Sequence, residues 1–414
     1  MFKKFKIFII FFTIISVLLC LMPTVLGDDV DDTIENSLAI QEEIVETSTN
    51  VNNESSIPTI NSRAAIVIDR NSNTVLYGKN ENEQRKMAST TKIMTSILVI
   101  ENCNLNETIE ISKKSAGTGG SRLGLKTGDK ITVNDLLYGL MLCSGNDTAV
   151  ALAEHVSGSV EGFAELMNNK AKELNLENTS FETPHGLDAP NHYTTAYELA
   201  VLSKYALNNE TFSKIVGTKT YTVTINGYLK TISNTNELLG NLNGVYGIKT
   251  GFTNGANRCL VTACKRDNLD IICVVLGADT KKFRTQDSIK LIEYAFKTYT
   301  PVSIQELIYN KFEEWKKENL KDFEIIKGEN NNISLKLEPL EYNTIPIKKE
   351  LINSLNINIK CNTILEAPVI KESIIGNITV SPSEINCNIL VDCNINKKNI
   401  IDYFVEFLKF YKQI

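Results

Sequence analysis

A serine and a lysine three residues apart form the first pair in this chain that could do chemistry. Ser89-Thr90-Thr91-Lys92 opens a run of apolar residues with helical spacing, and Ser89 is the only serine in the sequence with a lysine at that distance. The spacing places both side chains on one face of a helix. A nearby lysine can take the proton of a serine hydroxyl, and the N–H groups at a helix N-terminus can stabilise an oxyanion. Taken alone, the pair would equally fit a helix cap followed by a surface lysine.

Ser144-Gly145-Asn146 is a second candidate, because it follows an apolar helical segment and can present a hydroxyl and an amide to a cleft. Asp147 then provides a suitable N-cap for the next helix. A capping turn without any catalytic role fits the same residues.

The tripeptide Lys-Thr-Gly occurs twice. Lys126-Thr127-Gly128 lies in a polar stretch, whereas Lys249-Thr250-Gly251 ends an apolar strand-like run. A strand that lines a cleft needs the second context, since glycine permits close backbone approach while lysine and threonine supply a charge and a hydroxyl. We therefore assign 249–251 to the site and 126–128 to a structural turn.

Histidine and metal chemistry are not indicated. His155, His185 and His192 are the only histidines that could complete a Ser-His-Asp triad, and no serine lies in a nucleophile-elbow pattern. No metal-binding spacing is present, so we expect no metal and no cofactor.

The elements that must position these residues suggest an α+β fold. Strands at both ends of residues 60–300 surround a helical middle, which predicts a mainly antiparallel sheet flanked by helices. The expected strands are 64–68, 74–77, two within 218–232, 244–252, 257–265 and 271–278. The expected helices are 93–100, 134–143, 147–156, 160–174, 195–207 and 286–298.

Two further segments follow this domain. Short runs rich in Ile, Leu, Val and Asn predict a small all-β domain at 301–396. Residues 397–414 predict an amphipathic helix that is too short and too charged to span a bilayer. It could bind a membrane surface or dock on its own protein.

The N-terminus predicts export. Lysines followed by an apolar run at 7–22 indicate a signal peptide at 1–27, with an uncleaved membrane anchor as the alternative. Residues 28–59 are acidic and polar, as expected of a flexible linker. The net charge of −6 argues against a nucleic-acid partner, because phosphates require cationic surfaces.

Together the three motifs are the Ser-x-x-Lys, Ser-x-Asn and Lys-Thr-Gly set of penicillin-binding proteins and serine β-lactamases. Over about residues 60–300 the chain closely resembles the low-molecular-weight penicillin-binding proteins that are D-alanyl-D-alanine carboxypeptidases. The matching segments are 87–92, 137–147, 183–188, 192–196 and 247–253. One departure is Ala256-Asn257-Arg258-Cys259, where the family usually has Gly in the second position; Asn tolerates the left-handed conformation that such a turn can require.

The resemblance implies an exported serine carboxypeptidase that removes the terminal D-alanine from peptidoglycan stem peptides and binds β-lactams covalently. It implies that Ser89 is the nucleophile, Lys92 the general base and Ser144 the proton donor to the leaving D-alanine. It further implies that the backbone of Phe252 lies in the oxyanion hole. The substrate-binding residues that it implies are Asn146, Lys249, Thr250, Gly251, Phe252 and Arg284.

Two other functions use the same motifs. A class A β-lactamase would need a glutamate in a Glu-x-x-Leu-Asn pattern, but the nearest match, 171–175, begins with Ala171. A receptor that binds wall peptide or antibiotic without turnover would not need the complete set of serines and lysines. Both are therefore less favoured than a carboxypeptidase.

Overall fold

The computed structural model describes residues 46–47, 57–383 and 385–411. The predicted signal peptide, almost all of the predicted linker and the last three residues lie outside this part of the chain. The chain divides into two compact units. The first holds the described residues up to Ile292 except two segments, Ile68–Leu76 and Lys265–Ile271, which group with the second unit from Glu293 onward.

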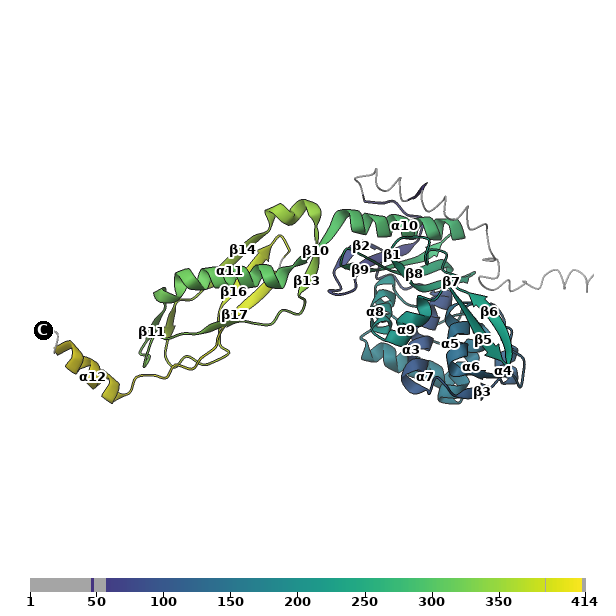
Figure 1. Ribbon diagram of the computed structural model, residues 1–414, viewed down its shortest axis with the longest axis horizontal. Coiled ribbons are helices and arrows are strands. Elements are labelled where there is room, and N and C mark those ends of the chain that lie inside the picture. Colours follow the sequence, from purple (N-terminus) through teal and green to yellow (C-terminus); the bar gives the residue numbers. More distant parts are fainter. Residues whose placement is uncertain (1–45, 48–56, 384, 412–414) are drawn as a thin grey trace, which may run out of the picture. The chain divides into compact units, whose positions relative to one another are not determined.

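A five-stranded sheet is the base of the first unit (Figure 1). Its strand order is β2-β1-β9-β8-β7, and β7 pairs antiparallel with β8. The central strands β1 and β9 are buried along their whole length, as expected of strands covered on both faces. The strand bounds are β1 Ala64–Asp69, β2 Val75–Lys79, β7 Val245–Thr253, β8 Asn257–Arg266 and β9 Leu269–Ala278.

Helices cover both faces of this sheet, with α10 on one side and the main helical group on the other (Figure 1). Every residue of α3 from Lys92 to Val99 is buried, because other helices enclose α3. The predicted antiparallel sheet flanked by helices is confirmed. The helix bounds are α3 Lys92–Asn102, α4 Lys113–Ala116, α5 Val133–Met141, α6 Asn146–Ser157, α7 Val160–Glu173, α8 Ala196–Leu207, α9 Glu210–Val216 and α10 Lys281–Thr298.

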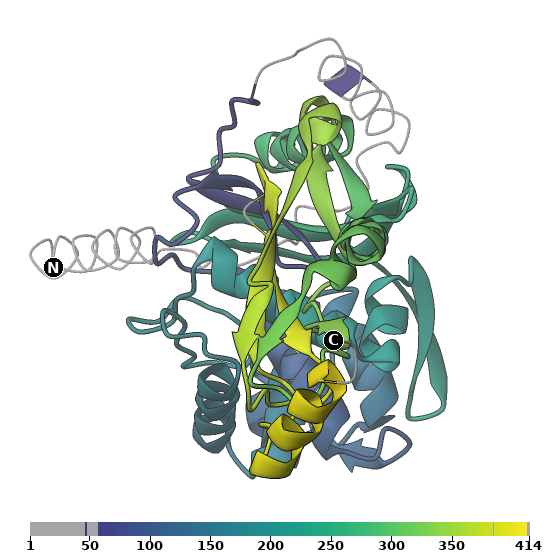
Figure 2. The same ribbon diagram turned by 90° about the vertical axis from the view of Figure 1, so that its left-hand side faces the viewer.

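Two two-stranded antiparallel sheets complete the first unit. One pairs β3 Thr108–Glu110 with β4 Lys130–Thr132, and the other is a hairpin of β5 Thr220–Ile225 and β6 Tyr228–Ser233, joined by the Asn226-Gly227 turn. The β5–β6 hairpin lies at the side of the helices in both views (Figures 1 and 2). Tyr221 of this hairpin stacks on Tyr138 of α5 with ring centroids 3.5 Å apart, which fixes the hairpin to the helical group.

The second unit is built mainly of strands, as predicted, around a four-stranded sheet with the order β12-β17-β16-β14. It also contains α11, Ile304–Asn319, which the sequence analysis did not predict. The buried side chains of α11, Ile304, Ile308 and Phe312, recur every four residues and pack into the core of this unit. The strand bounds are β10 Tyr299–Ser303, β11 Glu324–Ile326, β12 Leu335–Leu337, β13 Thr344–Lys348, β14 Asn356–Cys361, β15 Ile364–Glu366, β16 Ile374–Ser381 and β17 Ile385–Val391.

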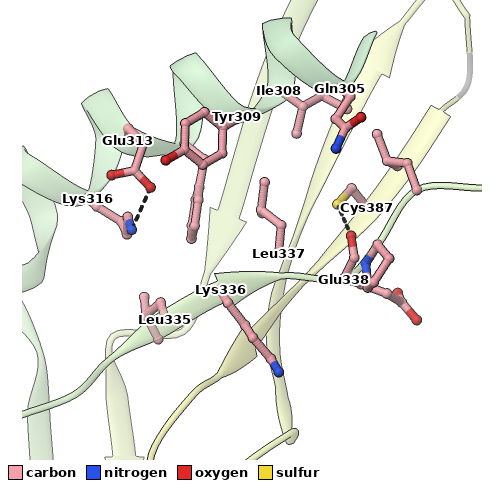
Figure 3. Close-up of a pocket in the computed structure, with 13 residues that line it drawn as sticks. Gln305, Ile308, Tyr309, Glu313, Lys316, Leu335, Lys336, Leu337, Glu338 and Cys387 are labelled. Carbon is pink, nitrogen blue, oxygen red and sulfur yellow. Dashed lines mark hydrogen bonds and ion pairs between the residues drawn. The ribbon is translucent and has the colours of Figure 1, made fainter. Parts of the chain in front are cut away.

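A cavity of about 410 Å³ lies between α11 and the edge strand β12 (Figure 3). Its wall combines apolar side chains such as Ile308 and Leu337 with the Glu313–Lys316 ion pair. None of the residues singled out from the sequence lines this cavity.

The described chain ends in a helix, α12, Ile400–Tyr411. Figure 1 shows it beyond the end of the four-stranded sheet of the second unit. Asn399 caps it by accepting hydrogen bonds from the backbone N–H groups of Ile401 and Asp402, at 2.8 and 3.1 Å. Among the described residues, no helix is both long and apolar enough to cross a membrane.

Candidate active site

Ser89 and Lys92 lie together in the core of the first unit. Ser89 is in a single 3-10 turn, η2 (Ala88–Thr91), and Lys92 is the first residue of α3. Both are buried, and Nζ of Lys92 lies 2.8 Å from Oγ of Ser89. The turn begins with Ala88, whose φ is +49°. The structure therefore brings the first predicted pair into hydrogen-bond contact.

Two carbonyl oxygens hold the amino group of Lys92 from other directions. Nζ donates to Oδ1 of Asn146 at 2.7 Å and to the backbone oxygen of His185 at 2.8 Å. The amide of Asn146 is in turn fixed, because its Nδ2 donates to the backbone oxygen of Gly119 at 2.8 Å. Both ends of the Asn146 amide are therefore hydrogen-bonded to protein groups.

Ser144 precedes α6 in a strained turn, at a φ of +60°. Its side chain is fully buried, and Oγ has no hydrogen-bond partner among the described residues. A buried hydroxyl without a partner is costly and marks a group that a ligand or water can satisfy. The expectation that Asp147 caps α6 is wrong. The helix begins at Asn146, and the carboxylate of Asp147 accepts hydrogen bonds from a neighbouring loop instead.

The Lys249-Thr250-Gly251 segment lies in β7, directly against the Ser89 turn. A Cβ atom on Gly251 would lie 3.0 Å from the backbone nitrogen of Ser89 and 3.1 Å from Cβ of Ala88. Glycine is therefore what allows the strand to approach this closely. Lys249 and Thr250 are buried, and Oγ1 of Thr250 lies 2.7 Å from Oγ1 of Thr235.

The other Lys-Thr-Gly lies in an exposed turn before β4. Residues 126–128 are all exposed, and the backbone N–H of Lys126 donates to the Asp129 carboxylate at 2.7 Å. A Cβ atom on Gly128 would meet no atom within 4 Å, so no other segment approaches there.

Phe252 and Arg284 occupy different surroundings. Phe252 is partly buried, and the guanidinium of Arg258 lies 3.9 Å from its ring centroid. Asn257 adopts a φ of +57°, as expected for the residue that replaces glycine in this turn. Arg284 is fully buried in α10 and forms an ion pair with Glu237, so its charge is balanced inside the protein.

The loop 183–188 supports the Ser89 turn, a role that the sequence analysis did not find. Besides the His185 oxygen on Lys92, the Pro184 oxygen accepts from Thr95 Oγ1 at 2.6 Å. Gly186 has a φ of +91°, and a Cβ atom on it would lie 2.0 Å from the Ala88 oxygen. At the end of the loop, Asp188 accepts from Thr253 Oγ1 at 2.8 Å, which ties the loop to β7. The only sequence signal for this role was the match to the family segment.

His185 and His192 are poor candidates for a general base. Burial lowers the pKa of His185 to about 3, with a further contribution from the nearby Lys92 charge. Burial also lowers the pKa of His192 to about 4. In each ring Nδ1 already accepts a backbone N–H, from Leu187 at 3.2 Å and from Glu182 at 3.0 Å. Both side chains hold loops in place.

Comparison with known proteins decides the family. The sequence model of the D-alanyl-D-alanine carboxypeptidase family matches residues 50–280. The chain belongs to this family. It is 35% identical over 325 residues to D-alanyl-D-alanine carboxypeptidase DacF of Bacillus subtilis, an alignment that covers 77% of this chain and 81% of the relative. It is 40% identical over 261 residues to DacC of Escherichia coli, covering 59% of this chain and 64% of that protein.

Solved structures agree with this carboxypeptidase assignment. Penicillin binding protein 5 from Haemophilus influenzae superposes with a TM-score of 0.68 at 28% identity, and the match covers 83% of this chain and all of that one. The Streptomyces K15 DD-transpeptidase matches with a TM-score of 0.56 at 35% identity over 58% of this chain and 99% of its own. The chain is thus a serine-type hydrolase with the fold of the penicillin-binding proteins.

Proposed function

We propose that this carboxypeptidase removes the terminal D-alanine from peptidoglycan stem peptides through an acyl-enzyme on Ser89. The observation that carries this proposal is the 2.8 Å contact between Lys92 Nζ and Ser89 Oγ in a buried site. β-Lactam antibiotics would acylate the same serine. The residue roles below follow from this contact and from the geometry around it.

The surroundings of Lys92 suit a general base. A neutral amine has two N–H bonds and one lone pair, and it is flanked here by two carbonyl oxygens and one hydroxyl. With the two N–H bonds directed to Asn146 Oδ1 and the His185 oxygen, the lone pair points to Ser89 Oγ. Lys92 then takes the hydroxyl proton as Oγ attacks the carbonyl carbon of the penultimate D-alanine.

The next steps use the other two motifs. The backbone N–H groups of Ser89 and Phe252 stabilise the oxyanion. The close approach of β7 to the Ser89 turn favours this role, since a Cβ atom on Gly251 would lie only 3.0 Å from the Ser89 nitrogen. The unpartnered hydroxyl of Ser144 donates a proton to the nitrogen of the leaving D-alanine. Ser144 then recovers a proton from Lys92, which carries the one it took from Ser89. Water then hydrolyses the acyl-enzyme and regenerates Ser89.

The substrate carboxylate is assigned to Lys249 and Thr250, which supply a charge and a hydroxyl from β7. We assign Arg284 and Asn146 roles that differ from those implied by the family resemblance. Arg284 is paired with Glu237, so its contribution to carboxylate binding is smaller than its charge suggests. Asn146 is committed to Lys92 and Gly119, which favours a role in holding the base over direct contact with the peptide.

A turnover assay separates this function from a β-lactamase and from a receptor. We expect steady release of D-alanine from a peptide ending in D-Ala-D-Ala, and with penicillin a stable acyl-enzyme with little hydrolysis. Ala171, which stands where a β-lactamase would carry its deacylating glutamate, is buried in α7. Fast penicillin hydrolysis without D-alanine release would show a β-lactamase, and binding of both without turnover would show a receptor.

The action of the protein on the cell wall places it outside the cytoplasm, and we propose that residues 1–27 direct this export. We further propose the domain limits 60–300 and 301–396, and that 397–414 bind the outer face of the cytoplasmic membrane. The supporting observation is that α12 exposes its apolar side chains. Ile400 is 87% exposed, Phe404 60% and Phe407 62%, while the exposed Lys397 next to them can meet anionic headgroups.

A further inference from the structure

Asp147 is a fully buried carboxylate in the first turn of α6. Its Oδ1 accepts from the backbone N–H groups of Leu123 and Thr148, at 2.9 and 3.0 Å. Its Oδ2 accepts from those of Gly124 and Leu125, at 2.8 and 3.0 Å. A buried negative charge is costly unless donors of this kind surround it. Four N–H groups converge here, so this position requires an acceptor on both side-chain atoms.

Three of these donors belong to one loop, residues 119–125, and the same loop holds Asn146. The backbone oxygen of Gly119 accepts from Nδ2 of Asn146 at 2.8 Å, and that of Ser121 accepts from its backbone N–H at 2.7 Å. Leu123 anchors the middle of the loop, since its side chain fills the space beside Gly139, where a Cβ atom would lie only 2.8 Å from it. Adjacent residues, 146 and 147, therefore bind the two ends of one loop.

The orientation of the Asn146 amide depends on this arrangement. With Nδ2 on the Gly119 oxygen, Oδ1 must face Lys92, where it lies 2.7 Å from Nζ. If the loop moved, the amide could turn and direct its N–H groups at Lys92. The amine would then lose one of the two acceptors that direct its lone pair to Ser89.

We propose that Asp147 is a positioning residue for the reaction. By holding loop 119–125 it fixes Asn146 with Oδ1 toward Lys92, and so aims the base at Ser89. This inference rests on the proposed roles of Ser89 and Lys92. It adds a residue that contacts neither substrate nor base and acts only through Asn146.

The test is a double-mutant cycle on acylation by a fluorescent penicillin, measured in the full-length protein well below its melting temperature. Asp147→Asn keeps the shape but places an NH2 group against N–H donors. We expect its acylation rate constant to fall about 10- to 100-fold, with the affinity of the non-covalent complex little changed. In an Asn146→Ala background the same substitution should cause no further loss.

Asp287 provides the matched control. It lies in α10, is buried, and accepts from the backbone N–H groups of Asn61 and Ser62, at 3.1 and 2.6 Å. Asp287→Asn should lower the melting temperature as Asp147→Asn does, but leave acylation within about two-fold, since its donors precede β1 and lie outside loop 119–125.

Three results would overturn the inference: normal acylation by Asp147→Asn, losses that multiply in the double variant, or normal acylation by Asn146→Ala. If Asp147→Asn does not fold, Asp147→Glu replaces it in the same cycle, because it keeps the charge but moves the carboxylate by one methylene. Failure of the proposed function is recognised separately, by labelling that persists in Ser89→Ala.

Discussion

At the scale of single residues, the site depends on backbone atoms as much as on side chains. Ser89, Lys92 and Ser144 could be predicted because their chemistry is in their side chains and their spacing is visible in the sequence. The acceptors on Lys92 could be predicted only in part, since one of them is the backbone oxygen of His185. Any residue has a backbone oxygen, so no residue type marks this contact.

Gly186 packs so closely against the backbone of Ala88 that no side chain fits there. Gly186→Ala should reduce stability by about 3 kcal/mol or more, because it combines a left-handed φ with a Cβ atom 2.0 Å from the Ala88 oxygen. The displaced Ser89 turn should also acylate more slowly. Chemical denaturation and penicillin labelling measure both effects.

Gly128→Ala is the matched control for this prediction. Gly128 has a φ of +85°, close to that of Gly186, but no atom lies within 4 Å of the added Cβ. Its cost should be limited to backbone strain, about 1–2 kcal/mol, with normal acylation. Equal losses from the two substitutions would show that contact with Ala88 is unimportant.

At the scale of elements, context separated the two Lys-Thr-Gly segments. The apolar run before Lys249 predicted a strand, and the polar residues around Lys126 predicted a turn; the structure has both. The helix α11 was missed although Ile304, Ile308 and Phe312 recur with helical spacing. That stretch was instead included in the predicted all-β domain 301–396, because short runs rich in Ile, Leu, Val and Asn dominate the segments that follow it. The supporting role of loop 183–188 was not predicted, because the segment has no regular structure and its periodicity carries no signal.

Substituting the two lysines tests the role of β7. Lys249→Ala should slow acylation on the order of 100-fold, because it removes a buried charge beside the proposed carboxylate site. Lys126→Ala removes an exposed charge and should leave acylation within a few-fold of wild type. Stopped-flow measurements with a fluorescent penicillin distinguish the two. The reverse order of effects would place the cleft at 126–128.

At the scale of the whole molecule, the sequence predicted a sheet flanked by helices, a strand-rich region and a terminal helix, and the described residues contain all three. Exposure of α12 could not be predicted, since an amphipathic pattern is the same for a docked helix and a membrane-bound one. In the structure its apolar side chains, from Ile400 to Leu408, are between 42% and 87% exposed. Each could contribute about 1–2 kcal/mol to membrane binding if fully immersed.

Removal of the tail tests this membrane role. A chain ending at Asn396 should remain folded and active but become soluble, whereas the full mature chain should sediment with membranes. Cell fractionation and D-alanine release report on the two properties. Membrane association of the shortened chain would locate the anchor elsewhere, with 7–22 as the first candidate. Loss of folding would instead assign the last helix to the protein core.

Ser89 is proposed to carry the acyl group, and mass spectrometry of the acylated enzyme can locate that group on the chain. The protein is incubated with a peptide ending in D-Ala-D-Ala or with penicillin, quenched in acid and digested. We predict that Ser89 carries either the peptide acyl group without the released D-alanine or the whole ring-opened penicillin. Neither added mass should appear on a folded Ser89→Ala variant. An acyl group on another serine, with Ser144, Ser112 and Ser115 as the first to examine, would show that Ser89 is not the nucleophile.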